Sequence, residues 1–428
     1  MAKLRNIFIF FLTAVGGLTT QWSYSANGLT GEAGQTISFR GAWIATVANI
    51  DWPSTEAVGK DSLQKAEMTF LLDSLQSIGI NAIIFQVRPT ADALYYSELE
   101  PTSHWLTGKQ SFPNHQSSII NHQLTYDPLA FVIDEAKKRG IEVHVWLNPY
   151  RVNLAKTDTS AICADHIFRK HPEWFWCYAK QWYFDPGLDV TRDWICRVVA
   201  DIVDRYDIQA IHMDDYFYPY PAGGKQLPDK ETFQQYPRGF TDIKEWRRNN
   251  VNLAIQEISE TIHECREGVE FGISPFGVWR NASVDSTGSQ TTAGITNYDD
   301  LYADIRLWIK NGWIDYVLPQ LYWEIGKKAA DYQILANWWA NEVKGSDCKL
   351  YIGMAPYRLE GAKRGTPWGT GNEIGRQMRL NRTIPEISGE CFYSTRPLLR
   401  NPRHVCDTIR RIYNNDDALN TPYVLPWE

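Results

Sequence analysis

The stretch YDPLAFVIDEAKKRGIEVHVWLNPYR, residues 126–151, contains one complete helix-to-strand unit. Asp127 and Pro128 are typical of a helix N-terminus, and an apolar stripe follows them at helical spacing. Gly140 ends the predicted helix, and the apolar run 141–147 comes next. Continuous apolar runs of this kind indicate parallel strands that are covered on both faces.

The same alternation of apolar run and amphipathic helix repeats along the chain. Three more long helices are predicted over 62–78, 190–205 and 241–266. The predicted strands are 39–47, 81–87, 141–147, 210–214, 270–274, 315–320, 349–354 and 390–393. This alternation predicts an α/β fold, a single (β/α)8 TIM barrel with long βα loops. We assign 39–414 to the barrel domain, 26–38 to an N-terminal linker and 415–428 to a C-terminal tail.

The first residues have the pattern of an export signal. Lys3 and Arg5 precede an apolar segment over 7–18, and small residues at Ser23 and Ser25 suit a signal peptidase. We therefore predict a signal peptide over 1–25 with cleavage near Ser25, and a periplasmic or secreted mature protein. The alternative is an uncleaved membrane anchor. No later apolar run is long enough to span a bilayer, so the mature chain is expected to lack an integral membrane span.

Charge and aromatic content narrow the class of partner. The 428 residues include 50 acidic and 43 basic side chains, a formal charge of −7. This balance offers no basic surplus for phosphates, so nucleic acid is not an expected partner. The chain also has 18 Trp and 22 Tyr, whose polar ends need partners when they are buried. Many of these rings are expected to line a groove.

Seven cysteines are present, none in a C-x-x-C pair or beside closely spaced histidines. A structural zinc site is not expected, and no metal or cofactor is predicted. The odd count leaves at least one cysteine free or intermolecular. Cys163 and Cys177 form the pair to test for a loop disulfide.

The residues that follow each predicted strand indicate a sugar site. Active sites of βα barrels form at the C-terminal ends of the strands. Nearly every strand end here carries a polar side chain and an aromatic ring, which suits the hydroxyls and the apolar faces of a pyranose. The candidate substrate-binding residues are Arg88, Asn148, Arg151, Trp146, Tyr216, Trp279, Gln320, Tyr322, Trp323 and Tyr357. Arg88 and Arg151 could instead form structural ion pairs, and the tryptophans of 173–182 could contact sugar or only cover the barrel.

Glycoside hydrolysis requires two carboxyl groups. Asp214 and Asp215 follow a buried apolar run, although adjacent aspartates often form only a solvated turn or a helix cap. Alternation along the strand places His212 and Asp214 on one face, and a polar histidine suits the barrel interior. We therefore predict that Asp214 enters the pocket as nucleophile or base, with His212 in the core. Asp215 or Glu324 is the candidate partner.

Six segments resemble the bacterial glycosyl hydrolase-like family 10, and the similarity extends over about residues 39–413. The segments are RGAWIATVANIDWP, NAIIFQVRPTADALYYSELEP, YDPLAFVIDEAKKRGIEVHVWLNPYR, RDWICRVVADIVDRYDIQAIHMDDYFYP, FGISPFGVWRN and DYVLPQLYWEIG. The resemblance implies a (β/α)8 barrel and an exported or envelope-associated glycosidase linked to cell-wall glycan strands. Asp214 and Asp215 fall on the family's DDYFYP motif, Arg88 on QVRP and Asn148 on NPYR. The second carboxylate is less clearly marked by the family pattern.

The sequence therefore predicts an exported glycoside hydrolase that cleaves a polysaccharide, with peptidoglycan glycan strands as the expected substrate. One alternative is a non-catalytic glycan-binding barrel of the cell envelope, which would need aromatic rings but no matched carboxylates. A second alternative is a polysaccharide deacetylase or another metal-dependent hydrolase, which the scattered histidines do not favour.

Overall fold

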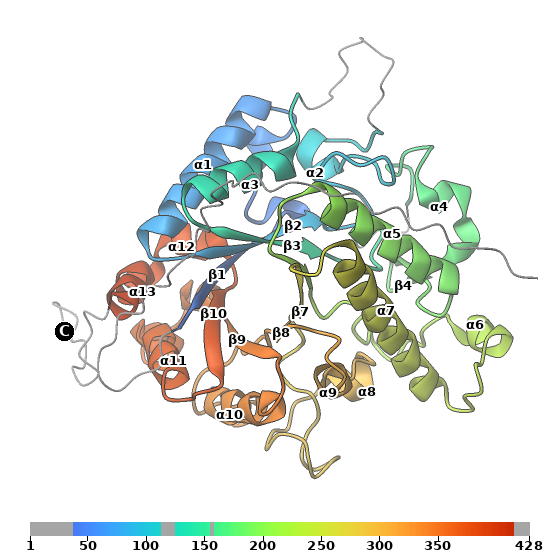
Figure 1. The fold of residues 1–428 in the computed structure, drawn as a ribbon. Coiled ribbons are helices and arrows are strands. Elements are labelled where there is room, and N and C mark those ends of the chain that lie inside the picture. The colour runs from blue at the N-terminus through green and yellow to red at the C-terminus, as the bar shows by residue number, and fades with distance from the viewer. Residues whose placement is uncertain (1–36, 113–124, 155–157, 415–428) are drawn as a thin grey trace, which may run out of the picture.

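The computed structural model describes residues 37–112, 125–154 and 158–414. Within them, parallel strands close into a barrel in which each strand neighbours the barrel strands before and after it along the chain (Figure 1). These strands are β1 (Phe39–Ile44), β2 (Ala82–Arg88), β3 (Glu142–Leu147), β6 (Ala210–Met213), β7 (Glu270–Ile273), β8 (Tyr316–Val317), β9 (Lys349–Met354) and β10 (Ile387–Phe392). Each predicted run contributes one strand, so the (β/α)8 barrel is confirmed.

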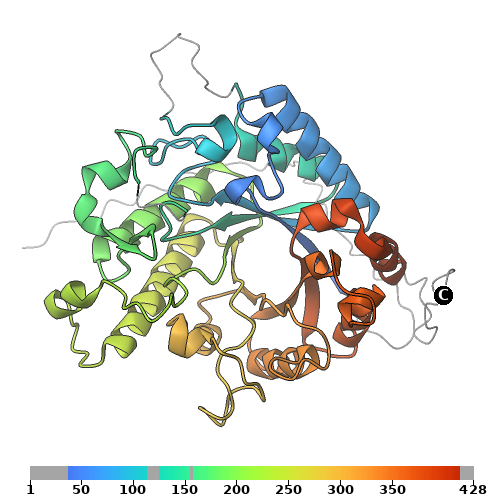
Figure 2. The same ribbon diagram turned by 180° about the vertical axis from the view of Figure 1, so that it is seen from behind.

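Helices form a ring around the barrel, as the two opposite views show (Figures 1 and 2). The longer ones are α1 (Asp61–Ser77), α3 (Pro128–Lys138), α5 (Asp189–Arg205), α7 (Ile243–Cys265), α10 (Tyr332–Val343), α11 (Glu373–Asn381) and α13 (Val405–Tyr413). The shorter ones are α2 (His104–Thr107), α4 (Ile167–Lys170), α6 (Lys230–Gln235), α8 (Asn297–Asp300), α9 (Ile305–Lys310) and α12 (Thr395–Arg400). The four helices predicted from the sequence correspond to α1, α3, α5 and α7.

The N-terminus of α3 forms as its sequence predicts. The Asp127 carboxylate accepts hydrogen bonds from the backbone N–H groups of Leu129 and Ala130 at 3.0 and 3.2 Å. These bonds satisfy two of the donors that the first helical turn leaves free. After the helix, Gly140 has a φ of +65°, a left-handed conformation that glycine adopts without a steric penalty. The chain then enters β3.

Two local features differ from the prediction. The run 315–320 yields only the short strand β8, because Pro319 has no N–H to donate to a ladder. The aromatic stretch 173–182 belongs to an antiparallel hairpin of β4 (Phe175–Tyr178) and β5 (Gln181–Phe184). Its turn residues, Ala179 and Lys180, both have positive φ, as in a type I′ turn, but lack the Asn-Gly signal that would have revealed the hairpin.

The barrel interior carries its own layer of side chains, separate from the layer between strands and helices. Ala210 belongs to the inner layer, whereas Ile211 and Met213 pack in the outer layer. His212 also faces inward, where its Nδ1 lies 2.9 Å from the Tyr316 hydroxyl. The predicted alternation along β6 is therefore confirmed, and Asp214 follows on the inward-facing side.

Close packing in this interior depends on glycine at one strand position. A Cβ on Gly272 would lie 1.8 Å from Cζ of Tyr316, so only glycine leaves room for that ring. The Tyr316 hydroxyl in turn contacts Nδ1 of both His144 and His212, at 2.9 Å each. The inner layer thus forms a fixed floor beneath the C-terminal ends of the strands.

Several predictions concern the cysteines and the chain ends. All seven cysteines are free thiols, so the disulfide predicted between Cys163 and Cys177 is not formed. The signal peptide over 1–25, nearly all of the linker and the tail after 414 lie outside the described residues. Among the helices that the structure describes, none is long and apolar enough to cross a membrane.

Candidate active site

A cavity of about 270 Å³ lies at the C-terminal ends of the barrel strands, where βα-barrel enzymes place their active sites. Residues in or after β1, β2, β3, β6, β7, β8 and β10 contribute to its wall. They are Trp43, Val47, Ile50, Gln86, Trp146, Arg151, Asp214, Asp215, Tyr216, Tyr220, Ser274, Gln320, Tyr322 and Tyr393. Two carboxylates, several aromatic rings and two amides therefore meet in one small space.

Asp214 is buried and held by donors on both of its carboxylate oxygens. Oδ2 accepts a hydrogen bond from Nδ2 of Asn148 at 2.6 Å, and Oδ1 accepts one from the N–H of Tyr216 at 3.2 Å. Burial raises the pKa of Asp214 above its usual value, while the positive charge of Arg151 and these hydrogen bonds act against the rise. The positive charge and the hydrogen bonds thus favour the ionised form of the Asp214 carboxyl group.

A chain of amides fixes the orientation of Asn148. Oε1 of Gln86 accepts hydrogen bonds from the N–H groups of Thr46 and Val47, so the Nε2 of Gln86 faces the other way. That Nε2 donates to Oδ1 of Asn148 at 2.6 Å, and Arg151 donates to the same oxygen at 2.9 Å. Asn148 therefore presents Nδ2, a donor, to Asp214, and Asp214 must act as an acceptor.

Asp215 has a different environment. The Tyr220 hydroxyl donates to its Oδ2. Burial and the adjacent negative charge of Asp214 raise the pKa of Asp215 to about 7, although hydrogen bonds from Tyr220 and Gln320 act in the opposite direction. Asp215 is therefore partly protonated near neutral pH, beside Asp214, whose negative charge opposes a second one on the pair. Environments that separate two carboxyl groups in this way are typical of acid–base pairs in enzymes.

The structure brings most of the predicted site residues together. Trp146, Arg151, Asp214, Asp215, Tyr216, Gln320 and Tyr322 line the cavity, and Asn148 lies directly behind Asp214. Asp215 lines the cavity beside Asp214. The alternation rule does not apply to it, because β6 ends at Met213.

Arg88 does not reach the cavity. Its guanidinium is buried against Glu100, with Nη2–Oε1 and Nε–Oε2 distances of 2.6 and 2.7 Å. Its Nη1 also donates to the backbone carbonyls of Asn148 and Pro149 at 2.6 and 2.9 Å. Arg88 thus holds the loop that carries Asn148, which is the structural ion-pair role considered from the sequence.

Replacing Glu100 by glutamine is expected to lower the free energy of unfolding by about 3 kcal/mol, because Arg88 would remain charged in the interior without a counter-ion. Denaturant unfolding followed by circular dichroism measures this. Asp207→Asn is the matched control, since Asp207 pairs with Lys137 on the surface and its loss should barely move the unfolding midpoint. Equal stabilities for the two variants would contradict the role of the buried pair.

Glu324 also lies outside the cavity. Its Oε2 accepts a hydrogen bond from Nε1 of Trp368 at 2.9 Å, and its Oε1 lies 3.3 Å from Nζ of Lys327. Burial acts to raise the pKa of Glu324, but hydrogen bonds from its own N–H, Trp368 and Lys327 lower it overall. A proton donor needs the opposite shift, so the structure does not support Glu324 as the partner acid.

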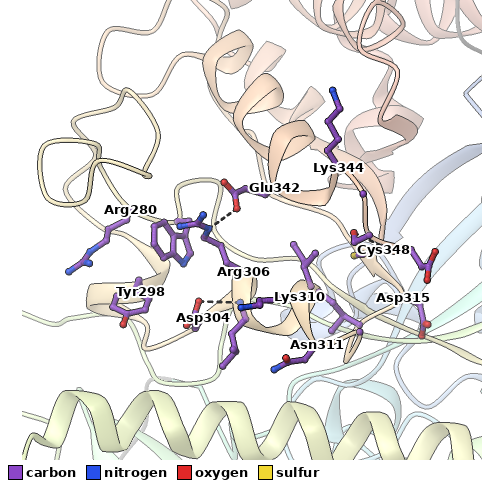
Figure 3. A pocket seen from close by; sticks show the side chains of 18 of the residues that line it. Arg280, Tyr298, Asp304, Arg306, Lys310, Asn311, Asp315, Glu342, Lys344 and Cys348 are labelled. Atoms are coloured by element: carbon purple, nitrogen blue, oxygen red, sulfur yellow. Dashed lines mark hydrogen bonds and ion pairs between the residues drawn. The ribbon is translucent and has the colours of Figure 1, made fainter.

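Trp279 lines a second cavity, of about 930 Å³, which lies outside the barrel beside α9 and α10 (Figure 3). Its ring stacks on Trp338 with centroids 5.9 Å apart, and the Arg306 guanidinium lies 4.6 Å from its ring centre. Figure 3 shows Arg306 turned toward Glu342, with which it forms an ion pair at 2.6 Å. Trp279 therefore does not line the cavity that contains Asp214 and Asp215.

The remaining predicted aromatic residues surround the site without lining it. Trp323 packs edge-on against Phe276, with ring centroids 5.4 Å apart. Tyr357 contacts the rings of Tyr322 and Tyr393, which do line the cavity, at 6.0 and 6.2 Å. The tryptophans of 173–182 belong to the β4–β5 region and do not line the cavity.

Sequence reasoning missed Trp43, Tyr220 and Tyr393 as site residues. Trp43 lies inside β1, and only the alternation of inward-facing and outward-facing side chains along that strand could have revealed it. Tyr220 comes one residue after the DDYFYP motif, and Tyr393 closes the last predicted strand. Gln86 and Ser274 stand at strand ends, where the barrel rule directs attention, yet were not selected.

No group of three or more metal-binding side chains of the His, Cys, Asp or Glu type gathers anywhere in the described ranges. Among the residues of the described chain that line the cavity, Asp214 and Asp215 are the only carboxylates.

Comparison with known families settles the relationship. The sequence profile of a family described as glycosyl hydrolase-like 10 matches residues 38–369. The chain belongs to this family. The resemblance seen in the sequence motifs is therefore confirmed, and the protein is a glycoside hydrolase. Two carboxylates at one cavity also favour an enzyme over the non-catalytic barrel considered from the sequence.

Curated relatives carry the same kind of name. Glycosyl hydrolase YngK of Bacillus subtilis (strain 168) is 45% identical over 388 residues, which are 90% of this chain and 73% of YngK. Glycosyl hydrolase DigH of Escherichia coli (strain K12) is 40% identical over 372 residues, 83% of this chain and 82% of DigH. The similarity to these two named glycosyl hydrolases thus extends over most of the chain.

Solved structures share the fold at low sequence identity. The PgaB (BpsB) glycoside hydrolase domain from Bordetella bronchiseptica superposes with a TM-score of 0.51 at 11% identity, over 88% of this chain and 98% of that domain. Alpha-L-fucosidase isoenzyme 2 from Paenibacillus thiaminolyticus gives 0.50 at 12% identity, over 88% of this chain and 49% of that protein. These similarities concern the barrel alone.

Proposed function

We propose that this glycosyl hydrolase is exported and cleaves glycosidic bonds within peptidoglycan glycan strands, with Asp214 and Asp215 as its reacting carboxyl groups. The observation that carries the proposal is the pair itself: two buried carboxyl groups share one cavity, and their surroundings favour a proton on Asp215. Glycoside hydrolysis needs one protonated and one ionised carboxyl group at the same sugar. Asp215 is then the acid, and Asp214 is the anion that stabilises the positive charge of the transition state.

The cavity wall suits a sugar ring. Trp43, Trp146, Tyr322 and Tyr393 offer apolar faces, and the Gln320 amide and Arg151 offer donors for hydroxyl groups. The Arg151 guanidinium also lies 5.1 Å from the ring centre of Tyr216, so a charged group and an aromatic ring lie together in the wall. Such a mixture binds both the faces and the edges of a pyranose.

Export is proposed from the N-terminal sequence. A basic start, an apolar segment over 7–18 and small residues at Ser23 and Ser25 form the pattern of a cleaved signal peptide. A periplasmic or secreted location would give the enzyme access to cell-wall glycans. Labelling the mature N-terminus after secretion tests this, and a start near residue 26 is the expected result.

Product analysis with purified protein tests the substrate. Peptidoglycan glycan strands freed of their peptides are incubated with wild-type protein and with Asp214→Asn, beside intact peptidoglycan and unrelated polysaccharides. We expect new reducing ends and shorter strands, with one water added per cleaved bond, only from the wild-type protein and the glycan strands. Cleavage of another polysaccharide alone would contradict the peptidoglycan assignment.

Hydrolysis is expected to survive exhaustive treatment with EDTA. Two carboxyl groups can perform the acid and base steps without a metal ion. The rate on glycan strands should be the same before and after treatment, with EDTA already saturated by calcium as the control for salt effects. A loss that zinc or another divalent ion restores would contradict this expectation.

A further inference from the structure

Both carboxyl groups of the site come from the same strand end. In the usual arrangement one carboxyl group protonates the leaving oxygen while the other acts on the opposite face of the sugar, about 5–9.5 Å away. Asp214 and Asp215 are consecutive residues directly after β6, with Cα atoms about 3.8 Å apart. They therefore approach a bound sugar from one wall of the cavity.

The facing wall supplies no second carboxylate. Among the described residues that line the cavity, the side chains contributed by β1, β8 and β10 and their loops are apolar, aromatic or amide groups: Trp43, Val47, Ile50, Gln320, Tyr322 and Tyr393. Asp51, a partly buried carboxylate that follows β1, lies outside the lining. Its oxygens accept hydrogen bonds from the Ala45 N–H, the Ser394 hydroxyl and the Arg396 N–H, each at 2.8 Å.

We propose that the nucleophile is the 2-acetamido group of the substrate, that Asp214 holds its N–H, and that Asp215 protonates the leaving oxygen. This inference rests on the proposed function and deepens it, since it restricts the sugar at the cleaved bond to an N-acetylated hexosamine.

The surroundings of Asp214 suit this task. Asn148 and Tyr216 bind its oxygens from the protein side, and each oxygen keeps a lone pair that can accept an amide N–H. The nearby rings of Trp43, Tyr322 and Tyr393 offer an apolar surface for an acetamide methyl group. The buried Ser274 hydroxyl lines the same cavity and has no hydrogen-bond partner in the described chain, so it is available to a substrate oxygen.

The reaction proceeds in two steps. The acetamide oxygen forms a bond to the anomeric carbon, the bond from that carbon to the leaving oxygen breaks, and the leaving oxygen takes the proton of Asp215. The product is an oxazolinium ion whose N–H is held by the Asp214 carboxylate. Water then attacks the anomeric carbon and gives a proton to Asp215. The bond between the anomeric carbon and the acetamide oxygen breaks, which restores the acetamide. One water is added, and the anomeric configuration is retained.

Modified glycan strands test this proposal. Peptide-free strands are N-deacetylated and then re-acylated in parallel with either acetyl or trifluoroacetyl groups, so that the two substrates share the same chemical history. Fluorine withdraws electron density from the carbonyl oxygen and weakens it as a nucleophile. At saturating substrate, we expect kcat on trifluoroacetylated strands to be lower by about 10-fold or more. Strands left with free amines should not be cleaved.

Two results would overturn the inference and leave the proposed function standing. One is equal kcat on acetylated and trifluoroacetylated strands. The other is a stable covalent adduct on Asp214 after incubation with a 2-deoxy-2-fluoroglycosyl fluoride, read by mass spectrometry of the digested protein. Failure to cleave either native or re-acetylated strands would overturn the proposed function, and this inference with it.

Discussion

Asp214→Asn is expected to lower kcat on glycan strands by about 10³-fold or more, a rise of about 4 kcal/mol in the barrier. Asparagine keeps the shape of the side chain and can still accept the hydrogen bond from the Tyr216 N–H. It removes the negative charge that stabilises the positive charge developing in the transition state. Steady-state kinetics measures the loss, and circular dichroism checks that the fold is intact.

A surface carboxylate provides the matched control for this substitution. Asp207→Asn makes the same chemical change at a residue whose side chain is 71% exposed and which does not line the cavity. Its kcat should equal that of the wild-type enzyme. Near-normal turnover by Asp214→Asn would remove Asp214 from the reacting pair.

Asp215→Asn is expected to lower kcat by about 10²–10⁴-fold on glycan strands, because the leaving sugar oxygen would depart without a proton donor. The loss should shrink on a substrate with a nitrophenol leaving group, which departs readily as an anion. A uniform loss on both substrates would indicate a structural defect in place of a missing acid.

The pH profile of the wild-type enzyme follows from the same assignment. Asp215 can donate only while it is protonated, so kcat/KM should fall as pH rises through about 7, the raised pKa of Asp215. This alkaline limb should disappear in Asp215→Asn. Tyr220→Phe removes a hydrogen bond that stabilises the Asp215 carboxylate, so it should move the limb to higher pH. A limb that stays in place in both variants would exclude Asp215 as the acid.

Local patterns in the sequence determined the architecture. The alternation of apolar runs and amphipathic helices predicts every barrel strand, because burial on both faces and helical periodicity are properties of short segments. Side chains alternate between the two faces of a strand, so His212 faces inward while Ile211 and Met213 face outward. The barrel rule then directs attention to strand ends, and so to Asp214.

Only the tertiary structure decided which of those residues form the site. Asn148 bonds to Asp214, 66 positions further along the chain, and Gln86 bonds to Asn148, 62 positions further along, because barrel closure sets the register of neighbouring strands. The loop after β2 folds back and buries Arg88 against Glu100, and Glu324 lies outside the cavity. The division of labour between Asp214 and Asp215 depends on burial and on donors from other strands. Neither quantity is a property of a short segment, so the local sequence could not determine it.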